Sequence, residues 1–252
     1  MIRAEATFLG HSTVLIEMGG TRVLTDPVLF DRVTILRRAV SPLPRQLYER
    51  VDAVVISHCH LDHLDIPSLL FLGTDVPLVV PRGAGRMLRR CGFRYVTELA
   101  AGEAVSNGGV TIRATPAAHS GFRPPFGPSA EAVGYLLDDG HERVYFAGDT
   151  DVFDEMATFA GIDLALLPVW GWGPRLGPGH MDPRRAAEAL TVLRPRAVVP
   201  IHWGTLWPLG LGRVRAHRLE RPPLEFERHA AELAPDVRVF VTPPGATVAI
   251  PR

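Results

Sequence analysis

Three histidines and an aspartate stand within seven consecutive residues of this chain. The run extends from Ser57 to His63 and places imidazoles at His58, His60 and His63 and a carboxylate at Asp62. Neutral imidazole nitrogens and carboxylate oxygens are the usual protein ligands of zinc and neighbouring transition metals. His58 and His60 lie two apart on an extended segment and point the same way, whereas Asp62 and His63 follow a turn. The spacing predicts two metal sites served by one segment; the alternative is a polar turn with chance histidines.

Further candidate ligands follow the ends of predicted strands. We expect four such strands, over Val51–Ile56, Val110–Thr115, Arg143–Ala147 and Ala197–Ile201. In the same order, they lead to His58, His119, Asp149 and His202. Ligands at strand ends gather at one edge of a sheet, where the sites of α/β proteins commonly form.

These residues predict two ligand sets. One set would be a three-histidine site with an open position for water, formed by His58, His60 and His119. The other would hold a second ion with Asp62, His63 and His202, and Asp149 would bridge the ions. Two ions about 3.5–4 Å apart can share a hydroxide that is nucleophilic at neutral pH, and they can polarise the bond under attack.

Each of the later ligands also has a simpler explanation when it is taken alone. His119 suits a surface loop, Asp149 suits a turn, and His202 suits a core position with its hydrogen bonds satisfied. These explanations weaken together, because each residue falls at a strand end and the first cluster needs partners.

Three other polar residues are candidates for supporting roles. His11 and His180 are either loop histidines or groups that orient a ligand or a carboxylate. Asp26 either caps the turn before Pro27 or accepts a hydrogen bond from a metal-bound histidine. His180 could also donate to a leaving group or an oxyanion. We expect both Asp62 and His180 to take part in the chemistry directly. The remaining histidines are expected at the surface: His141, His217 and His229.

Several other side chains near these positions have open assignments. Cys59 alternates with His58 and His60, so we expect it to pack behind the site. Arg123 and Arg175 could hold a phosphate or carboxylate or be solvated. Six aromatic residues could form an apolar substrate wall or ordinary core: Phe122, Phe126, Trp170, Trp172, Trp203 and Trp207.

The rest of the chain alternates between strand and helix patterns. Other strands are expected at Ala6–Gly10, Thr13–Glu17, Arg22–Thr25, Leu78–Val80, Val133–Leu137, Leu164–Leu167, Val237–Val241 and Thr247–Ile250. Gly19-Gly20 and Asp139-Gly140 are hairpin signals. Helices are expected from the Asp65 cap to Leu72, over Gly85–Arg90, from Asp182-Pro183 to about Leu193, and near Leu224–Leu233, while Pro27–Arg50 is expected to be irregular. This order fits two sheets packed face to face with helices outside, in a single domain of residues 1–252.

Composition narrows the function classes. The 252 residues carry 27 basic and 27 acidic side chains, so the net charge is zero and gives no case for nucleic acid or an anionic membrane as main partner. Two cysteines, Cys59 and Cys91, do not suggest a disulfide framework. We expect no signal peptide and no membrane-spanning run, hence a cytoplasmic protein that acts on a small molecule, with a homo-oligomer possible.

Taken together, the motifs resemble those of the metallo-β-lactamase-fold hydrolases. The resemblance rests on the run at His58–His63, on His119, on Gly148–Thr150 and on His202. The branch that includes L-ascorbate-6-phosphate lactonase and N-acylphosphatidylethanolamine-hydrolysing phospholipase D is most similar, on Gly10–Thr13, Thr25–Pro27, Gly179–Pro183 and Ile201–Thr205. The resemblance implies an α/β (α+β) four-layer αββα sandwich with the metals at one edge of the sheets. It also implies the ligand sets given above.

These observations predict a metal-dependent hydrolase in which a metal-bridging hydroxide attacks a phosphodiester or a lactone. Two divalent ions are expected as cofactors: zinc suits the ligands best, and manganese or iron also occupy mixed His/Asp sites. Two alternatives stay open, a metal-dependent nuclease and a non-catalytic metal-binding protein that retains the fold. Zero net charge disfavours the nuclease, and the complete ligand set disfavours the non-catalytic protein.

Overall fold

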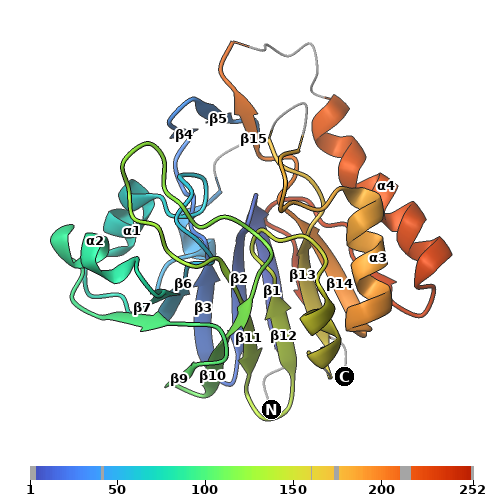
Figure 1. Ribbon diagram of the computed structural model, residues 1–252, viewed down its shortest axis with the longest axis horizontal. Helices are drawn as coiled ribbons and strands as arrows, with labels where there is room; N and C mark the ends of the chain where they lie inside the picture. Colours follow the sequence, from blue (N-terminus) through green and yellow to red (C-terminus); the bar gives the residue numbers. More distant parts are fainter. Residues whose placement is uncertain (1–3, 41–42, 160, 173–175, 211–216, 251–252) are drawn as a thin grey trace.

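The computed structural model describes residues 4–40, 43–159, 161–172, 176–210 and 217–250. Two mixed β-sheets pack face to face, and helices cover their outer sides (Figure 1). The predicted αββα arrangement is therefore confirmed. Within the described ranges, no helix is both long and apolar enough to cross a membrane.

The first sheet contains the segment that leads into the histidine run. Its strands, in spatial order, are β17 (Thr247–Ala249), β1 (Glu5–Gly10), β2 (Thr13–Met18), β3 (Thr21–Thr25), β6 (Ala53–Val55), β7 (Leu78–Pro81) and β8 (Val96–Leu99). The hairpin predicted at Gly19-Gly20 is present, because Met18 pairs with Thr21. From β3 to β8 the strands run parallel, so β6 ends at the same edge as its neighbours.

The second sheet carries the other three predicted ligand-bearing strands. Its order is β16 (Arg238–Val239), β14 (Ala197–Ile201), β13 (Leu164–Pro168), β12 (Arg143–Phe146), β11 (Val133–Asp138), β10 (Val110–Pro116) and β9 (Ala104–Asn107). β12, β13 and β14 are parallel, whereas β10 and β11 are antiparallel. Asp139-Gly140 lies in the loop between the paired residues Asp138 and Arg143, as its hairpin signal predicts.

A third, smaller sheet forms where the sequence indicates irregular structure. It consists of β4 (Arg32–Val33), β5 (Leu36–Arg38) and β15 (Leu206–Pro208). A short 3₁₀ helix, η1 (Arg45–Leu47), follows β5 within the same Pro27–Arg50 stretch. The expectation of a wholly irregular stretch was wrong, because strands of two or three residues are too short to show an alternating pattern.

Helix boundaries follow the capping signals in two cases. Asp65 caps α1 (Ile66–Leu72) by accepting from the Ser68 amide, and Asp182 caps α3 (Pro183–Leu193) in the same way through the amide of Arg185. α2 (Gly85–Arg90) has the predicted bounds. A second 3₁₀ helix, η2 (Asp154–Thr158), lies before β13.

The last helix begins earlier than the sequence suggests. α4 (His217–Leu233) includes Pro222 and Pro223, whereas the pattern predicts a start near Leu224. Proline lacks the amide hydrogen that an interior helical residue donates, and this favours a start after the pair. Packing overrides that preference, because Leu219, Pro222 and Pro223 in the added part of the helix are buried.

Alternation along the strands divides the core into layers. In β2, Val14 and Ile16 face the main core between the sheets, while Leu15 faces a second core. That second core also holds Leu69 of α1 and Leu88 of α2. The main core continues beneath α3 and α4 on the other side of the molecule.

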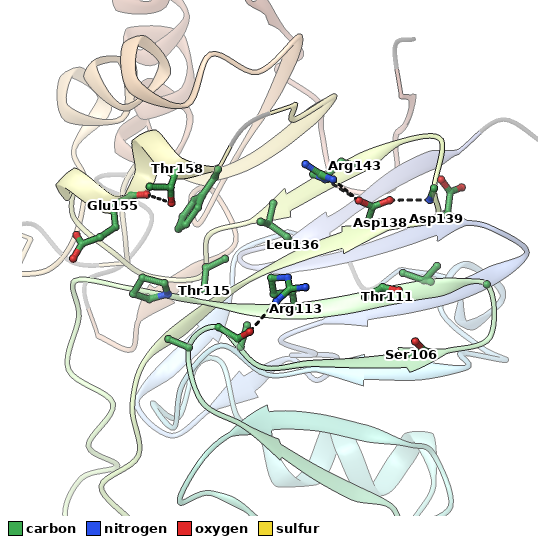
Figure 2. A pocket seen from close by; sticks show the side chains of 18 of the residues that line it. Ser106, Thr111, Arg113, Thr115, Leu136, Asp138, Asp139, Arg143, Glu155 and Thr158 are labelled. Carbon is green, nitrogen blue, oxygen red and sulfur yellow. Dashed lines mark hydrogen bonds and ion pairs between the residues drawn. The ribbon is translucent and has the colours of Figure 1, made fainter.

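Part of the outer face of the second sheet forms an open hollow of about 1080 Å³ (Figure 2). Thr111 and Arg113 point outward there, while Ile112 between them faces the core. Three of its charged side chains are already bonded: Arg143 pairs with Asp138 at 2.6 Å, and Arg113 donates to the Gly102 carbonyl at 2.8 Å. This hollow is separate from the predicted ligand residues.

Candidate metal centre

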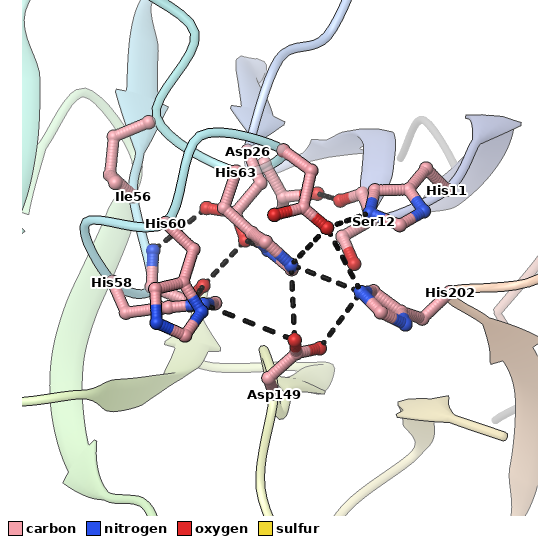
Figure 3. A network of polar contacts seen from close by, with 12 residues as sticks. His11, Ser12, Asp26, Ile56, His58, His60, His63, Asp149 and His202 are labelled. Atoms are coloured by element: carbon pink, nitrogen blue, oxygen red, sulfur yellow. Dashed lines mark hydrogen bonds and ion pairs between the residues drawn. The ribbon is translucent and has the colours of Figure 1, made fainter. Parts of the chain in front are cut away.

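The ends of β6, β10, β12 and β14 bring the predicted ligands together at one edge of the two sheets. Figure 3 shows Asp149 facing His58, His63 and His202. Asp149, just after β12, is central to the cluster and is 2% exposed. One of its oxygens, Oδ2, lies 3.2 Å from Nε2 of His63 and 3.9 Å from Nε2 of His58. The other, Oδ1, lies 3.2 Å from Nε2 of His202. The carboxylate thus faces histidines of both predicted sets.

The first predicted set, His58, His60 and His119, converges. Their inward nitrogens all lie within 4.8 Å of one another. Nε2 of His119 is 3.2 Å from Nδ1 of His60. His60 therefore presents Nδ1 to the centre, while its two partners present Nε2.

The second set converges as well, and a fourth side chain joins it. One ligand atom from each of His11, Asp62, His63 and His202 lies within 4.8 Å of the others. Nε2 of His63 is 3.1 Å from Nε2 of His202, and Nε2 of His11 is 3.0 Å from Oδ2 of Asp62. The sequence leaves His11 as either a loop histidine or an orienting group, and its buried place beside Asp62 fits the orienting role.

Hydrogen bonds to the backbone determine the tautomers of two histidines. Nδ1 of His119 donates to the Gly179 carbonyl at 2.8 Å, and Nδ1 of His202 donates to the Trp170 carbonyl at 2.7 Å. A carbonyl oxygen only accepts, so the proton of each neutral ring is on Nδ1. The lone pair on Nε2 then points into the centre, as a metal ligand requires.

Asp26 supports one histidine of each set. Nδ1 of His63 donates to Oδ2 of Asp26 at 2.7 Å. Oγ of Ser57 donates to the same carboxylate oxygen at 2.5 Å, so it can only accept from Nδ1 of His58, which lies 3.0 Å away. The predicted contact between Asp26 and a candidate ligand is therefore present, directly to His63 and through Ser57 to His58.

Two features of the centre fit a bound cation. Nε2 of His58 is buried, carries a lone pair by the reasoning above, and has no hydrogen-bond partner among the described residues. Asp62 and Asp149 place two carboxylates beside His63 and His202, and such a pair needs positive charge nearby. Nitrogen and carboxylate donors of this kind suit zinc and its neighbours.

The electrostatics of the protein alone lead to the same conclusion. Burial lowers the pKa of His119 to about 4 and that of His202 to about 3, so both rings are neutral near pH 7. Burial also acts to lower the pKa of His63, but Asp149 and Asp62 raise it well above 6.5. Without an ion, the proton on His63 therefore supplies positive charge between the carboxylates. Metal binding would take over that role and release the proton.

Several residues of the centre have left-handed backbone conformations. His11, Asp26 and His202 have φ angles of 55°, 33° and 62°. Such a conformation in a residue other than glycine costs on the order of 1–3 kcal/mol and clusters at functional sites. Gly148, beside Asp149, has a φ of 60°, and a Cβ there would lie 2.4 Å from Cβ of Ser57. The backbone is thus held in conformations that direct these side chains inward.

The loop after β13 supplies two more polar groups. Nε1 of Trp172 donates to Oδ2 of Asp62 at 3.0 Å. Nε2 of His180 lies 3.4 Å from Oδ2 of Asp149, and Nδ1 of His180 lies 3.1 Å from the Gly177 carbonyl. The structure therefore brings His180 to the centre, and it adds Trp172, for which the sequence indicates only a place in an apolar wall or the core.

Other candidates lie elsewhere or have different partners. Cys59 is buried in the second core, as its alternation predicts. Trp203 is buried and stacks on Phe8. Arg123 donates to the carbonyls of Cys59 and Leu64 at 2.9 and 2.8 Å, so its guanidinium supports the turn of the histidine run.

The other predictions concern the exposure of aromatic and histidine side chains. Phe122 and Phe126 are exposed, which excludes them from the core. His141 is exposed as expected, whereas His229 is half-buried on α4. Arg175 and the side chain of His217 lie outside the described residues.

Comparisons with known proteins agree with this architecture. The family model for the β-lactamase superfamily domain matches residues 21–203. A UPF0173 metal-dependent hydrolase of Nitratidesulfovibrio vulgaris is 35% identical over 269 residues, which cover 100% of this chain and 97% of that protein. The N-acyl-phosphatidylethanolamine-hydrolyzing phospholipase D 1 of Caenorhabditis elegans is 34% identical over 231 residues, which cover 81% of this chain and 65% of that protein.

A solved structure extends the likeness to three dimensions. Igni18, a metallo hydrolase of the archaeon Ignicoccus hospitalis, matches with a TM-score of 0.75 and 26% identity over 98% of both chains. The chain belongs to the β-lactamase superfamily and, within it, to the UPF0173 metal-dependent hydrolases.

Proposed function

We propose that this protein hydrolyses an ester-type bond, a phosphodiester or a lactone, with two divalent metal ions. The observation that carries the proposal is the position of Asp149, whose carboxylate faces histidines of both ligand sets. When bound, two such ions would supply a shared hydroxide that is nucleophilic at neutral pH, and they would polarise the bond under attack. The named activity of the phospholipase relative supports an ester bond.

The ligands of the two ions follow from the convergence of side chains. One ion would be held by His58, His60 and His119. The other would be held by Asp62, His63 and His202, with Asp149 shared between the ions. Zinc suits this mixture of imidazole and carboxylate donors best, although manganese and iron(II) also bind such mixed sites.

His180 and Asp62 have distinct roles in this proposal. His180 is half-buried beside Asp149 and lines the cavity over the centre, so its imidazole can donate a proton to the leaving oxygen. Asp62 accepts from His11 and Trp172, which fix the orientation of its carboxylate. In hydrolysis the elements of water are added across the bond: one oxygen joins the acyl carbon or phosphorus, and the leaving oxygen takes a proton.

The test compares the metal-loaded protein on two substrates, bis(p-nitrophenyl) phosphate and a simple γ-lactone. We expect metal-dependent turnover of at least one of them, which a chelator abolishes and added metal restores. The variant His60→Ala should lose this activity, because it removes one of three ligands of an ion. Full turnover by metal-free His60→Ala protein would contradict the proposal. Bound metal without hydrolysis of either ester type would favour a non-catalytic metal-binding protein.

A further inference from the structure

A cavity of about 420 Å³ opens directly over the metal centre. Its inner wall includes His60, Asp149, His180 and His202. The opposite wall is formed by the turn from Val33 to Leu36, which joins β4 and β5 of the small third sheet. This sheet lies beyond the edge of the sandwich at which the ligands gather (Figure 1). A bound substrate would therefore lie between the metal groups and the third sheet.

Outside the metal-binding groups, the lining of the cavity is mainly apolar. Its apolar side chains come from three separate segments: Val33, Ile35, Leu36, Leu61, Trp172 and Leu176. Val33 and Leu36 belong to a buried cluster, and Leu61 and Trp172 pack against it. Packing therefore holds this part of the wall in place for each substrate.

Among the described residues that line the cavity, the charged side chains are confined to the metal centre. Among the described lining residues none is Lys or Arg, and the acids are Asp62 and Asp149. Arg123 is close in sequence to the lining residue Pro124, but its guanidinium donates to two backbone carbonyls. A substrate can carry a charged group away from its scissile bond. In this cavity that group would lose its hydration, and no described lining residue there would offset the loss with an opposite charge, so its burial is costly.

We propose that the substituent next to the scissile bond of the substrate is apolar and uncharged. This inference rests on the proposed function, since it assigns the reacting bond to the metal side of the cavity. The apolar wall would bind the substituent, and the metal side would bind the carbonyl or phosphoryl group. Esters with sugar, nucleotide or carboxylate-bearing substituents are then poor substrates.

The experiment measures kcat/KM of the metal-loaded protein for a series of γ-lactones with methyl, ethyl, butyl and hexyl side chains. A matched lactone has a side chain of butyl length that ends in a carboxylate. We expect kcat/KM to rise about fourfold per added methylene until the cavity is filled, because burial of each methylene is favourable. The carboxylate analogue should be at least about tenfold slower than the butyl compound. If the enzyme prefers phosphodiesters, the same comparison uses alkyl and carboxyalkyl p-nitrophenyl phosphates.

A matched pair of variants locates the effect. Ile35 lines the cavity and is 62% exposed, so Ile35→Glu should fold and place a charge beside the apolar wall. Leu70 on α1 is 46% exposed and is not among the lining residues, so Leu70→Glu makes the same charge change elsewhere. We expect Ile35→Glu to reduce the preference for butyl over methyl several-fold and Leu70→Glu to leave it unchanged.

The outcomes separate this inference from the proposed function. Equal or faster turnover of the carboxylate analogue, or no change of preference in Ile35→Glu, would overturn the inference while hydrolysis itself stands. If no ester is hydrolysed although metal is bound, the proposed function fails. Calorimetric binding of the butyl and carboxylate lactones to the metal-loaded protein then decides the preference: tighter binding of the butyl compound supports it, and tighter or equal binding of the carboxylate overturns it.

Discussion

Asp26 and His63 form a fully buried pair in which Nδ1 of His63 donates to the Asp26 carboxylate at 2.7 Å. The same carboxylate accepts from Ser57, which in turn accepts from His58. One residue thus fixes the ring orientation and tautomer of a histidine in each predicted ligand set. Partners of this kind raise the basicity of a ligand and hold it for the metal.

The first prediction concerns this pair. Asp26→Asn removes the negative charge and keeps the shape, so we expect metal affinity to fall about 10- to 100-fold. Competition with a chromogenic chelator measures the change. Asp75→Asn, at an exposed site that pairs with Arg94, is the control and should leave the affinity unchanged. Unaltered metal affinity in Asp26→Asn would show that the carboxylate does not support the ligands.

Arg123 gives a second prediction. It connects the loop of His119 to the turn of the histidine run through the carbonyls of Cys59 and Leu64. Arg123→Ala leaves these carbonyls without their donor, and we expect weaker metal binding and a loss of stability of about 1–3 kcal/mol. Urea unfolding of the metal-free protein measures the stability. Arg123→Lys, which retains one donor group, should recover part of both losses, and equal losses in the two variants would contradict the positioning role.

The third prediction is the pH dependence of the metal-free protein. Burial lowers the pKa of His119 to about 4 and of His202 to about 3, from 6.5. Below pH 6.5 the unfolded chain therefore binds more protons at these residues than the folded chain does. As the pH is lowered from 6.5 to the folded-state pKa values, the free energy of unfolding decreases. His63 has the opposite sign: its raised pKa gives a contribution that is complete below 6.5 and is lost as pH rises through the folded value.

The measurement is urea unfolding in a chelating buffer at a series of pH values. We expect lower stability near pH 5 than near pH 7, and a smaller difference in His119→Gln, which removes one of the titrating rings. A stability that is flat or rises toward pH 5 in the unmodified protein would be inconsistent with neutral, buried imidazoles.

Sequence patterns predicted much of the fold because its main elements have strong local signals. The helix caps at Asp65 and Asp182 and the Gly19-Gly20 turn are all present. The strand before His58 is wholly apolar, and the strand before His202 has five buried residues. Both therefore have a sequence pattern that predicts a buried strand. Parallel pairing of the strands around them then brings these ends to one edge.

The features that the sequence did not predict depend on tertiary contacts. β5 and β15 have three residues each and pair across about 170 positions, so neither has a local pattern. The bond from Trp172 to Asp62 and the contacts of Arg123 also join distant segments. These contacts define the cavity wall and the supports of the ligands, which is why the spacing of the histidines indicated a metal site but not its surroundings.

Metal stoichiometry tests the central claim most directly. The protein is loaded with zinc, freed of excess by gel filtration, and its zinc and protein contents are measured by elemental and amino-acid analysis. Two ligand sets that share Asp149 predict two zinc ions per chain in the unmodified protein, and fewer in Asp149→Ala. One ion or none per chain in the unmodified protein would contradict a dinuclear centre.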